Sequence, residues 1–124
     1  MYTIQGTYTL KITAEDIDDI MCSALEGGIT YWCNCAKVVG NYLGEYAHEQ
    51  ISKGGTLLLC DTEEDEEYEL TRDKLLNGIK LAYEQNWFSS YGWVIGQELD
   101  TCQIDADVAD TIIQLSLFGE VVYG

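Results

Sequence analysis

The chain has few basic residues and no proline. Its 124 residues include 6 lysines and arginines against 22 aspartates and glutamates, which gives a formal net charge of −16. So few cations argue strongly against a protein that binds the phosphates of DNA or RNA. A charge this one-sided costs folding free energy through self-repulsion, and it usually reflects a basic partner or a need for solubility. The absence of proline suits a compact fold whose turns are made by glycine.

Long apolar runs are also missing. The longest apolar stretches, such as 56–60, fall far short of the ~20 residues that a membrane-crossing helix needs. No basic or apolar segment of a signal peptide is visible at the N-terminus, so we expect a cytoplasmic protein with no membrane association. Hydrophobic residues make up 47% of the chain. Because disordered chains combine high charge with low hydrophobicity, we predict one compact domain over residues 1–124.

Motifs that would name a reaction are absent. The single histidine, His48, lies in a polar segment, and no Ser or Cys stands in a recognisable nucleophile elbow. Five cysteines are present, but the Cys33-x-Cys35 spacing is narrower than zinc sites usually have, and no second pair follows. No phosphate-binding loop or dinucleotide fingerprint occurs. We therefore predict no enzymatic activity, no metal site and no cofactor, and we expect reduced, structural thiols.

Strands are predicted from alternation and from short apolar runs. Residues 2–12 alternate between apolar and polar side chains, which predicts one half-buried strand. Segments 56–60 and 68–70 are expected to pair as a hairpin that bends at the acidic run between them. A short terminal strand is expected within 120–124.

Helices are predicted from caps and apolar stripes. Thr13, Thr71 and Asp105 each precede an apolar pattern of helical spacing, so each is expected to cap a helix. The pair Gly27-Gly28 is expected to end the first helix as a C-cap. With a further short helix at 45–52, these elements predict an α+β fold, in which a small antiparallel sheet packs against three to four helices.

The densest charge lies at 61–67, where six of seven residues are acidic. One interpretation is a solvated bend that only keeps the protein soluble. The other is an electrostatic contact for a basic surface, because such a line of carboxylates resembles the charge line of a nucleic-acid backbone. A calcium loop is disfavoured, since the EF-hand's central glycine and ligand order are missing. The predicted contact residues are Asp61, Glu63, Glu64, Asp65, Glu66 and Glu67, with Asp16, Asp18 and Asp19 as secondary members.

A second candidate is the glycine–aromatic segment at 24–32. A helix end, two glycines and two aromatic residues would let the backbone approach a ligand and would supply a stacking surface. The simpler interpretation is a helix end followed by core aromatics. As a small-molecule site it would use Glu26, Gly27, Gly28, Tyr31, Trp32 and Gln114. An aromatic pocket near Tyr31, Trp32 and the 87–93 loop would then take a nucleotide signal, although the net charge disfavours an anion.

The same segment carries a resemblance. ALEGGITYW at 24–32, together with DADVADTIIQLSLFGEVVYG at 105–124, resembles a family of small uncharacterised bacteriophage and prophage proteins with ALEGG-x-x-YW and C-terminal FGE-x-x-x-G motifs. The middle, 44–82, resembles versions from prophages of gut Firmicutes. The resemblance covers nearly the whole chain and implies a phage context without an activity. The positions it marks are Glu26, Gly27, Gly28, Tyr31, Trp32, Asp110, Gln114, Phe118, Gly119 and Glu120.

These observations lead to two hypotheses from different classes. The first is a non-enzymatic phage-type binding protein in the bacterial host cell. It would use its acidic surface to inhibit a basic host protein, one that binds nucleic acid or acts in defence, as anti-CRISPR proteins do. The second is a small-molecule binder that sequesters a nucleotide signal. Direct binding of nucleic acid is not expected, and the many aromatic residues leave homo-oligomerisation open.

Overall fold

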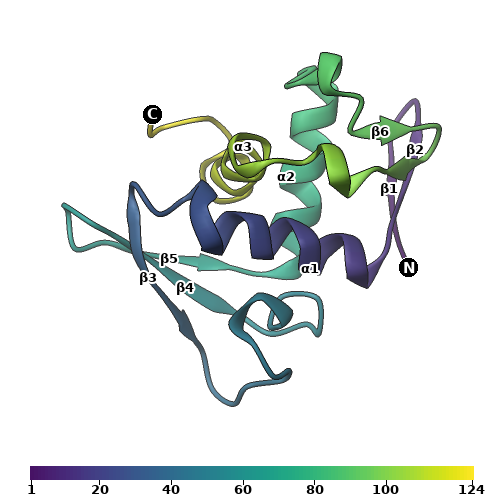
Figure 1. Cartoon of the computed structure of the whole chain (residues 1–124). Helices are drawn as coiled ribbons and strands as arrows, with labels where there is room; N and C mark the ends of the chain where they lie inside the picture. The colour runs from purple at the N-terminus through teal and green to yellow at the C-terminus, as the bar shows by residue number, and fades with distance from the viewer.

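Three helices lie beside two small sheets in the computed structural model, which describes residues 1–124 (Figure 1). The helices are α1 (Ala14–Ser23), α2 (Arg72–Glu84) and α3 (Ala106–Phe118). Among the helices, α2 and α3 share the most extensive packing. The predicted α+β class is therefore confirmed. None of the helices combines the length and the apolar character needed to cross a bilayer.

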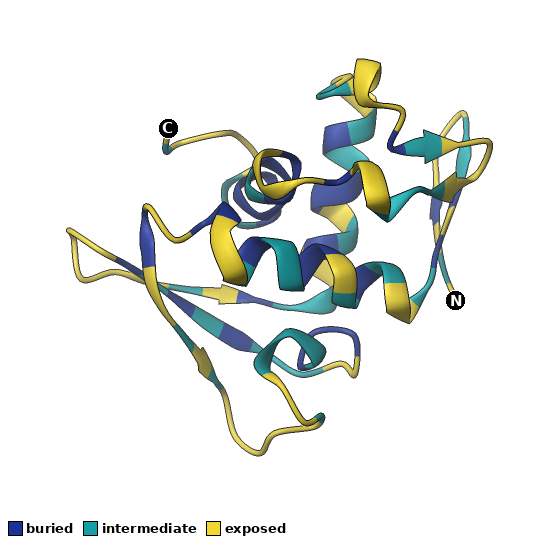
Figure 2. Ribbon diagram, viewed as in Figure 1, coloured by how far each residue is buried: buried dark blue, intermediate teal, exposed yellow.

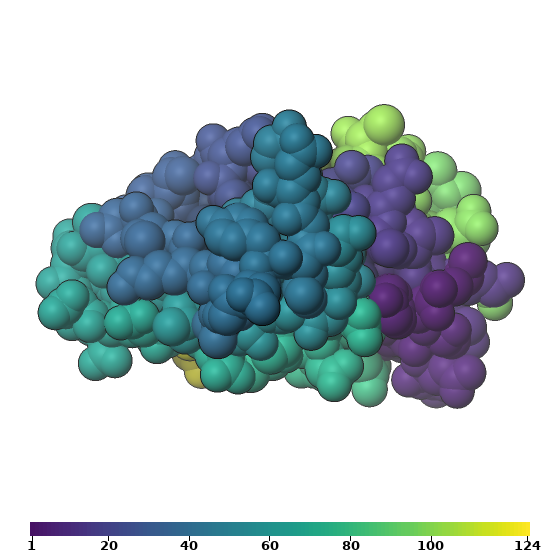
Figure 3. Space-filling model, turned by 90° about the horizontal axis from the view of Figure 1, so that it is seen from below, coloured from purple at the N-terminus to yellow at the C-terminus, as the bar shows by residue number.

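The strands form two sheets where the sequence predicted one. The first sheet has the order β3-β4-β5 with both pairs antiparallel: β3 (Cys33–Val38), β4 (Leu57–Asp61) and β5 (Glu67–Leu70). The second has the order β1-β2-β7-β6: β1 (Tyr2–Gln5), β2 (Thr9–Ile12), β6 (Val94–Ile95) and β7 (Glu98–Leu99). Seen from below, the blue connection between β3 and β4 lies between the teal β4–β5 side and the purple N-terminal hairpin (Figure 3).

The segment predicted as one strand over 2–12 is a hairpin. Strands β1 and β2 pair antiparallel, with Ile4 opposite Leu10 and Tyr2 opposite Ile12. Cross-strand partners share a face of the sheet, and here the partners have the same parity in the sequence. The apolar alternation therefore continues through the turn unchanged, and it cannot distinguish a hairpin from one long strand.

The first helix begins as predicted but ends differently. Thr13 Oγ1 accepts from the Asp16 backbone N–H and Asp16 Oδ2 accepts from the Thr13 N–H, both at 3.0 Å, which completes a capping box. Beyond Ser23 the chain continues as a π-helical turn, η1 (Ala24–Gly28), so the predicted glycine C-cap is wrong. A Cβ at Gly28 would stand 2.6 Å from the backbone oxygen of Ala106. Gly28 is needed for the close approach of η1 to α3.

Other predicted elements are confirmed in part. Thr71 and Asp105 cap α2 and α3, and Gly119 ends α3 with a φ of 73°. The predicted helix at 45–52 is only a short 3-10 turn, η2 (Ala47–Glu49). The predicted terminal strand at 120–124 is an irregular tail.

A single hydrophobic core joins the helices and the inner faces of the sheets. It contains 24 buried apolar residues, among them Ile17 of α1, Ile79 of α2 and Ile112 of α3. The buried parts of the three helices gather in the centre of the molecule, while the loops at its ends are exposed (Figure 2). The acidic run lies at one of these ends, where β4 turns into β5.

Candidate functional site

The acidic loop, defined as residues 62–66, connects β4 to β5 and projects from the edge of the molecule (Figure 1). All four of its acidic residues, 63–66, are exposed. The chain has one salt bridge, between Lys37 and Glu67 at 3.7 Å, and it lies at the base of the loop. The carboxylates of 63–66 therefore have no cationic partner within the protein.

Asp61 belongs to the same acidic run but turns inward. The residue is 6% exposed, and its Oδ1 accepts the backbone N–H groups of Glu63 at 2.6 Å and Glu64 at 2.8 Å. Its Oδ2 accepts the hydroxyl proton of Tyr123. These bonds, that of Tyr123 foremost, lower the pKa of Asp61. The sequence placed Asp61 among the contact residues, whereas its carboxylate fixes the backbone of the acidic loop.

Tyr123, in the irregular tail, supports the base of the acidic loop through Asp61. Its ring stacks on Trp32 with centroids 4.7 Å apart and planes within 3°. The hydroxyl oxygens of Tyr68 and Tyr123 are 3.0 Å apart, and Tyr68 donates, because the one proton of Tyr123 goes to Asp61. Burial and the Asp61 carboxylate raise the pKa of Tyr123. The phenol therefore stays protonated and remains a donor.

Gln114 holds the same tail. Its Oε1 accepts the backbone N–H groups of Val122 at 2.7 Å and Tyr123 at 2.8 Å. Its Nε2 donates to Asp110 Oδ1 at 2.9 Å, and to the Tyr31 hydroxyl and the Tyr123 carbonyl at 3.2 Å. Gln114 is fully buried. Its hydrogen-bonding groups are all used, so it clamps the tail and offers nothing to a ligand.

The two end motifs meet at Asp110. The Tyr31 hydroxyl donates to Asp110 Oδ2 at 2.6 Å, and Trp32 Nε1 donates to Oδ1 at 2.9 Å. Burial and this carboxylate raise the pKa of Tyr31 to about 12. Trp32 is 3% exposed and belongs to the core, whereas Tyr31 is 54% exposed. The glycine–aromatic segment is thus mainly a structural junction between η1, α3 and the tail.

Two members of the small-molecule set lie outside this junction. Glu26 and Gly27 are exposed on η1, and a Cβ at Gly27 would meet nothing within 4 Å. The aromatic pocket expected to join Tyr31 and Trp32 with the 87–93 loop does not form. Tyr31 and Trp32 border a cavity of 230 Å³ beside the acidic loop. The 87–93 loop borders a separate cavity of 760 Å³.

Neither cavity suits the phosphates of a nucleotide. No lysine or arginine lines either of them. The smaller one is instead bordered by Asp61, Glu63 and Glu64. A phosphate would meet repulsion there without the cationic or helix N-terminal groups that bind such anions. Sequestration of a nucleotide signal is therefore unsupported.

The secondary acidic residues lie on α1, apart from the acidic loop (Figure 1). Asp16 is used in the capping box, and Asp19 accepts from Thr101 Oγ1 at 2.8 Å. Asp18 is half-buried, and its Oδ1 is inaccessible and unpartnered. These three residues are thus separated from the acidic loop, and two of them already have partners within the chain.

Sequence reasoning missed Tyr68 and Tyr123. Tyr123 occupies a variable position of the terminal motif, and only its place between Gln114 and Asp61 reveals its role. No group of three or more His, Cys, Asp or Glu side chains is arranged to hold a metal ion. Comparisons of the chain with protein-family models, with curated proteins and with solved structures returned no match.

Proposed function

We propose that this protein is a non-enzymatic binding protein whose acidic loop contacts a basic surface of a partner protein. One observation carries the proposal: the four carboxylates at 63–66 are exposed and unpaired, yet Asp61 fixes the backbone beneath them. Bonds from an Asp side chain to the next backbone N–H groups are common in turns, but here Tyr123 ties this turn to the C-terminal tail as well. The bonds of Asp61 to Glu63, Glu64 and Tyr123 hold the backbone that carries these charges.

Electrostatics favours a cationic partner for this loop. Four carboxylates on consecutive residues repel one another, and neighbouring basic side chains would relieve that repulsion. A loop that is already ordered loses less conformational entropy when it binds. Exposed charges of this kind chiefly raise association rates, and their effect weakens as salt screens them.

We infer the class of partner from the shape of the charge. A short line of carboxylates is a substitute for a line of phosphates, so a protein built to hold nucleic acid presents a suitable basic surface. The resemblance of the end motifs to phage proteins favours a host protein of this class, including a defence nuclease. Occupation of its nucleic-acid channel would then inhibit it.

The test uses two variants with the same change in net charge. The loop-neutral variant carries Glu63→Gln, Glu64→Gln, Asp65→Asn and Glu66→Gln. Asparagine suits position 65 because Asp65 has a φ of 57°, and Asn tolerates the left-handed region. The matched variant neutralises four exposed acids elsewhere, namely Glu45→Gln, Asp73→Asn, Glu98→Gln and Glu120→Gln.

The experiment is capture from host lysate with each tagged protein, followed by identification of stoichiometric partners. The proposal expects the parent and the matched variant to capture a basic, nucleic-acid-binding protein. The loop-neutral variant should not capture it. Capture that both variants retain would exclude the acidic loop as the contact. Equal loss in both variants would assign the binding to net charge alone.

A further inference from the structure

The largest cavity lies at the end of the molecule opposite the acidic loop (Figure 1). It is formed by the β1–β2 turn, the C-terminal end of α2 and the segment 86–96. Its volume of 760 Å³ falls within the range of small-molecule sites, ~300–1,000 Å³. None of the residues that line the cavity belongs to the acidic loop, so the cavity is separate from the contact surface of the proposed function.

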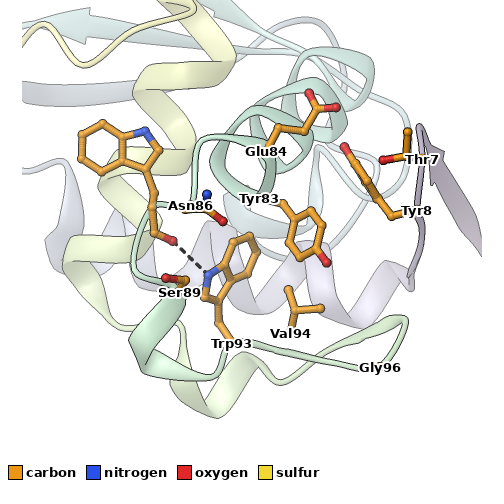
Figure 4. A pocket seen from close by; sticks show the side chains of 10 residues that line it. Thr7, Tyr8, Tyr83, Glu84, Asn86, Ser89, Trp93, Val94 and Gly96 are labelled. Carbon is orange, nitrogen blue, oxygen red and sulfur yellow. Dashed lines mark hydrogen bonds between the residues drawn. The ribbon is translucent and has the colours of Figure 1, made fainter.

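Aromatic rings form one wall of this cavity. The ring centroids of Tyr8 and Tyr83 are 4.8 Å apart, and those of Tyr83 and Trp93 are 6.4 Å apart. Figure 4 shows Tyr83 between Trp93 and Tyr8. Trp93 is 2% exposed, and its Nε1 donates to the Trp87 carbonyl at 3.1 Å, which fixes the indole. The faces and edges of such rings offer an apolar wall with negative electrostatic potential over the ring faces.

The charge around this wall is negative. Glu84, the last residue of α2, lines the cavity, and no lysine or arginine does. The C-terminal end of a helix carries a partial negative charge, which adds to that of the Glu84 carboxylate. These features disfavour an anionic ligand and favour a cation.

The Tyr8 hydroxyl lies within the same wall, closed off from solvent and beside the Glu84 side chain. Burial, and then the Glu84 carboxylate, raise the pKa of Tyr8 to about 12, so the hydroxyl stays neutral. A Cβ at Gly6 would come within 3.1 Å of the Tyr8 ring and 3.6 Å of a Glu84 oxygen. Glycine at position 6 thus leaves room for Tyr8 to approach α2.

We propose that this cavity binds a small organic ammonium ion. The alkyl groups of the ion would lie against the half-buried rings of Tyr8 and Tyr83, where cation–π attraction acts, and the buried indole of Trp93 supports Tyr83 from behind. The Glu84 carboxylate would serve as the counter-ion. The aromatic wall, the single carboxylate and the absence of basic residues together specify this chemistry.

The first test compares choline with its neutral carbon analogue, in which a tert-butyl group replaces the trimethylammonium group. Both are titrated into the protein at constant ionic strength and followed by two-dimensional amide NMR spectra. The proposal expects choline to shift the signals of residues 6–8, 83–86 and 93–96 in a saturable way. Equal shifts with the neutral analogue, no saturable shift with choline, or choline shifts confined to the acidic loop would each overturn it.

The second test uses Glu84→Gln with Glu120→Gln as the matched control. Both glutamates are exposed, and Glu120 lies on the tail, outside this cavity. We expect Glu84→Gln to weaken choline binding about fivefold or more and Glu120→Gln to leave it within about twofold. If Glu84→Gln has a native circular dichroism spectrum and binds choline with unchanged affinity, Glu84 is not the counter-ion and the proposal is overturned.

A competition experiment distinguishes two sources of the ammonium group, a free small molecule and a methylated lysine side chain of a protein. An acetylated and amidated trimethyllysine competes with choline for the cavity. Tighter binding of the lysine derivative would assign the ammonium group to a protein side chain, and tighter binding of choline would assign it to a free small molecule. Both results support an ammonium site, whereas failure of the lysine derivative and choline to compete would contradict a single shared cavity.

Discussion

The hydroxyl of Tyr123 donates a hydrogen bond to the buried carboxylate of Asp61, 62 positions earlier in the chain. This bond joins the C-terminal tail to the base of the acidic loop. Asp61 in turn accepts the backbone N–H groups of Glu63 and Glu64. The backbone of the acidic loop thus depends on Tyr123, the residue before Gly124.

Replacement of Tyr123 by phenylalanine should loosen the acidic loop without changing its charge. The phenylalanine ring can keep the stack on Trp32, but Asp61 loses its side-chain donor. We expect faster hydrogen exchange at the Glu63 and Glu64 amides, measured by NMR. Amides of α2, such as Ile79, serve as the internal control. Unchanged exchange at 63 and 64 would show that Tyr123 does not support the loop.

The stability that Asp61 contributes should depend on pH. Its pKa is lowered in the folded protein, so the folded state binds fewer protons than the unfolded state in acid. The contribution is present above about pH 4, the ordinary pKa of Asp, and is lost as the pH falls through the lowered folded value. Parent and Asp61→Asn are compared by urea unfolding at a series of pH values. We expect their difference to shrink on acidification, and a difference that is constant or grows in acid would contradict this assignment.

Loss of the Gln114 side chain should destabilise the fold substantially. Gln114→Ala removes five hydrogen bonds around a fully buried amide and leaves Asp110 and Tyr31 with fewer donors. We expect the free energy of unfolding to fall by about 2–4 kcal/mol, measured in urea. The exposed Gln103→Ala is the control and should change it by less than about 0.5 kcal/mol. Similar small effects in both variants would refute the clamp.

Cys35 and Cys60 should form a disulfide under mild oxidation. They are register partners across β3 and β4, and the Cα atoms of antiparallel partners lie roughly 4.5–5.5 Å apart, which is within the range that a disulfide spans. Burial, and then the neighbouring Cys35, raise the pKa of Cys60, so the reaction should speed up as the pH rises. An oxidant such as diamide removes the two electrons and two protons.

Peptide mapping by mass spectrometry identifies the bond. Cys35→Ser should abolish it, whereas Cys102→Ser should not, although both side chains are exposed. Oxidation that yields only intermolecular dimers through Cys102 would contradict the predicted pairing.

Local chemistry explains which elements the sequence predicted. Thr13, Thr71 and Asp105 were recognisable as caps because a cap bonds to backbone three residues away. The role of Gly28 was not recognisable from the sequence, because it depends on the close approach of Ala106, which lies in a helix distant in the chain. Nothing in the local sequence distinguishes Asp61, which faces inward, from the exposed acids that follow it.

Long-range pairing also decided where the candidate sites lie. The sequence grouped Tyr31, Trp32 and the 87–93 loop by composition, and the fold separates them into two cavities. The alternation over 2–12 predicted the buried face correctly, but the same parity fits a strand or a hairpin. Residue type therefore identified the exposed acids of the loop, whereas the contacts of Tyr68 and Tyr123 and the lining of the larger cavity depend on the tertiary arrangement.

The most direct test of the acidic contact is the association rate constant for the captured partner, measured side by side for three proteins. The parent, the loop-neutral variant and the matched variant are compared at low ionic strength. We predict that the loop-neutral variant associates about tenfold more slowly than the parent and that the matched variant stays within about threefold. Equal slowing of both variants, or none in either, would contradict a contact through the acidic loop.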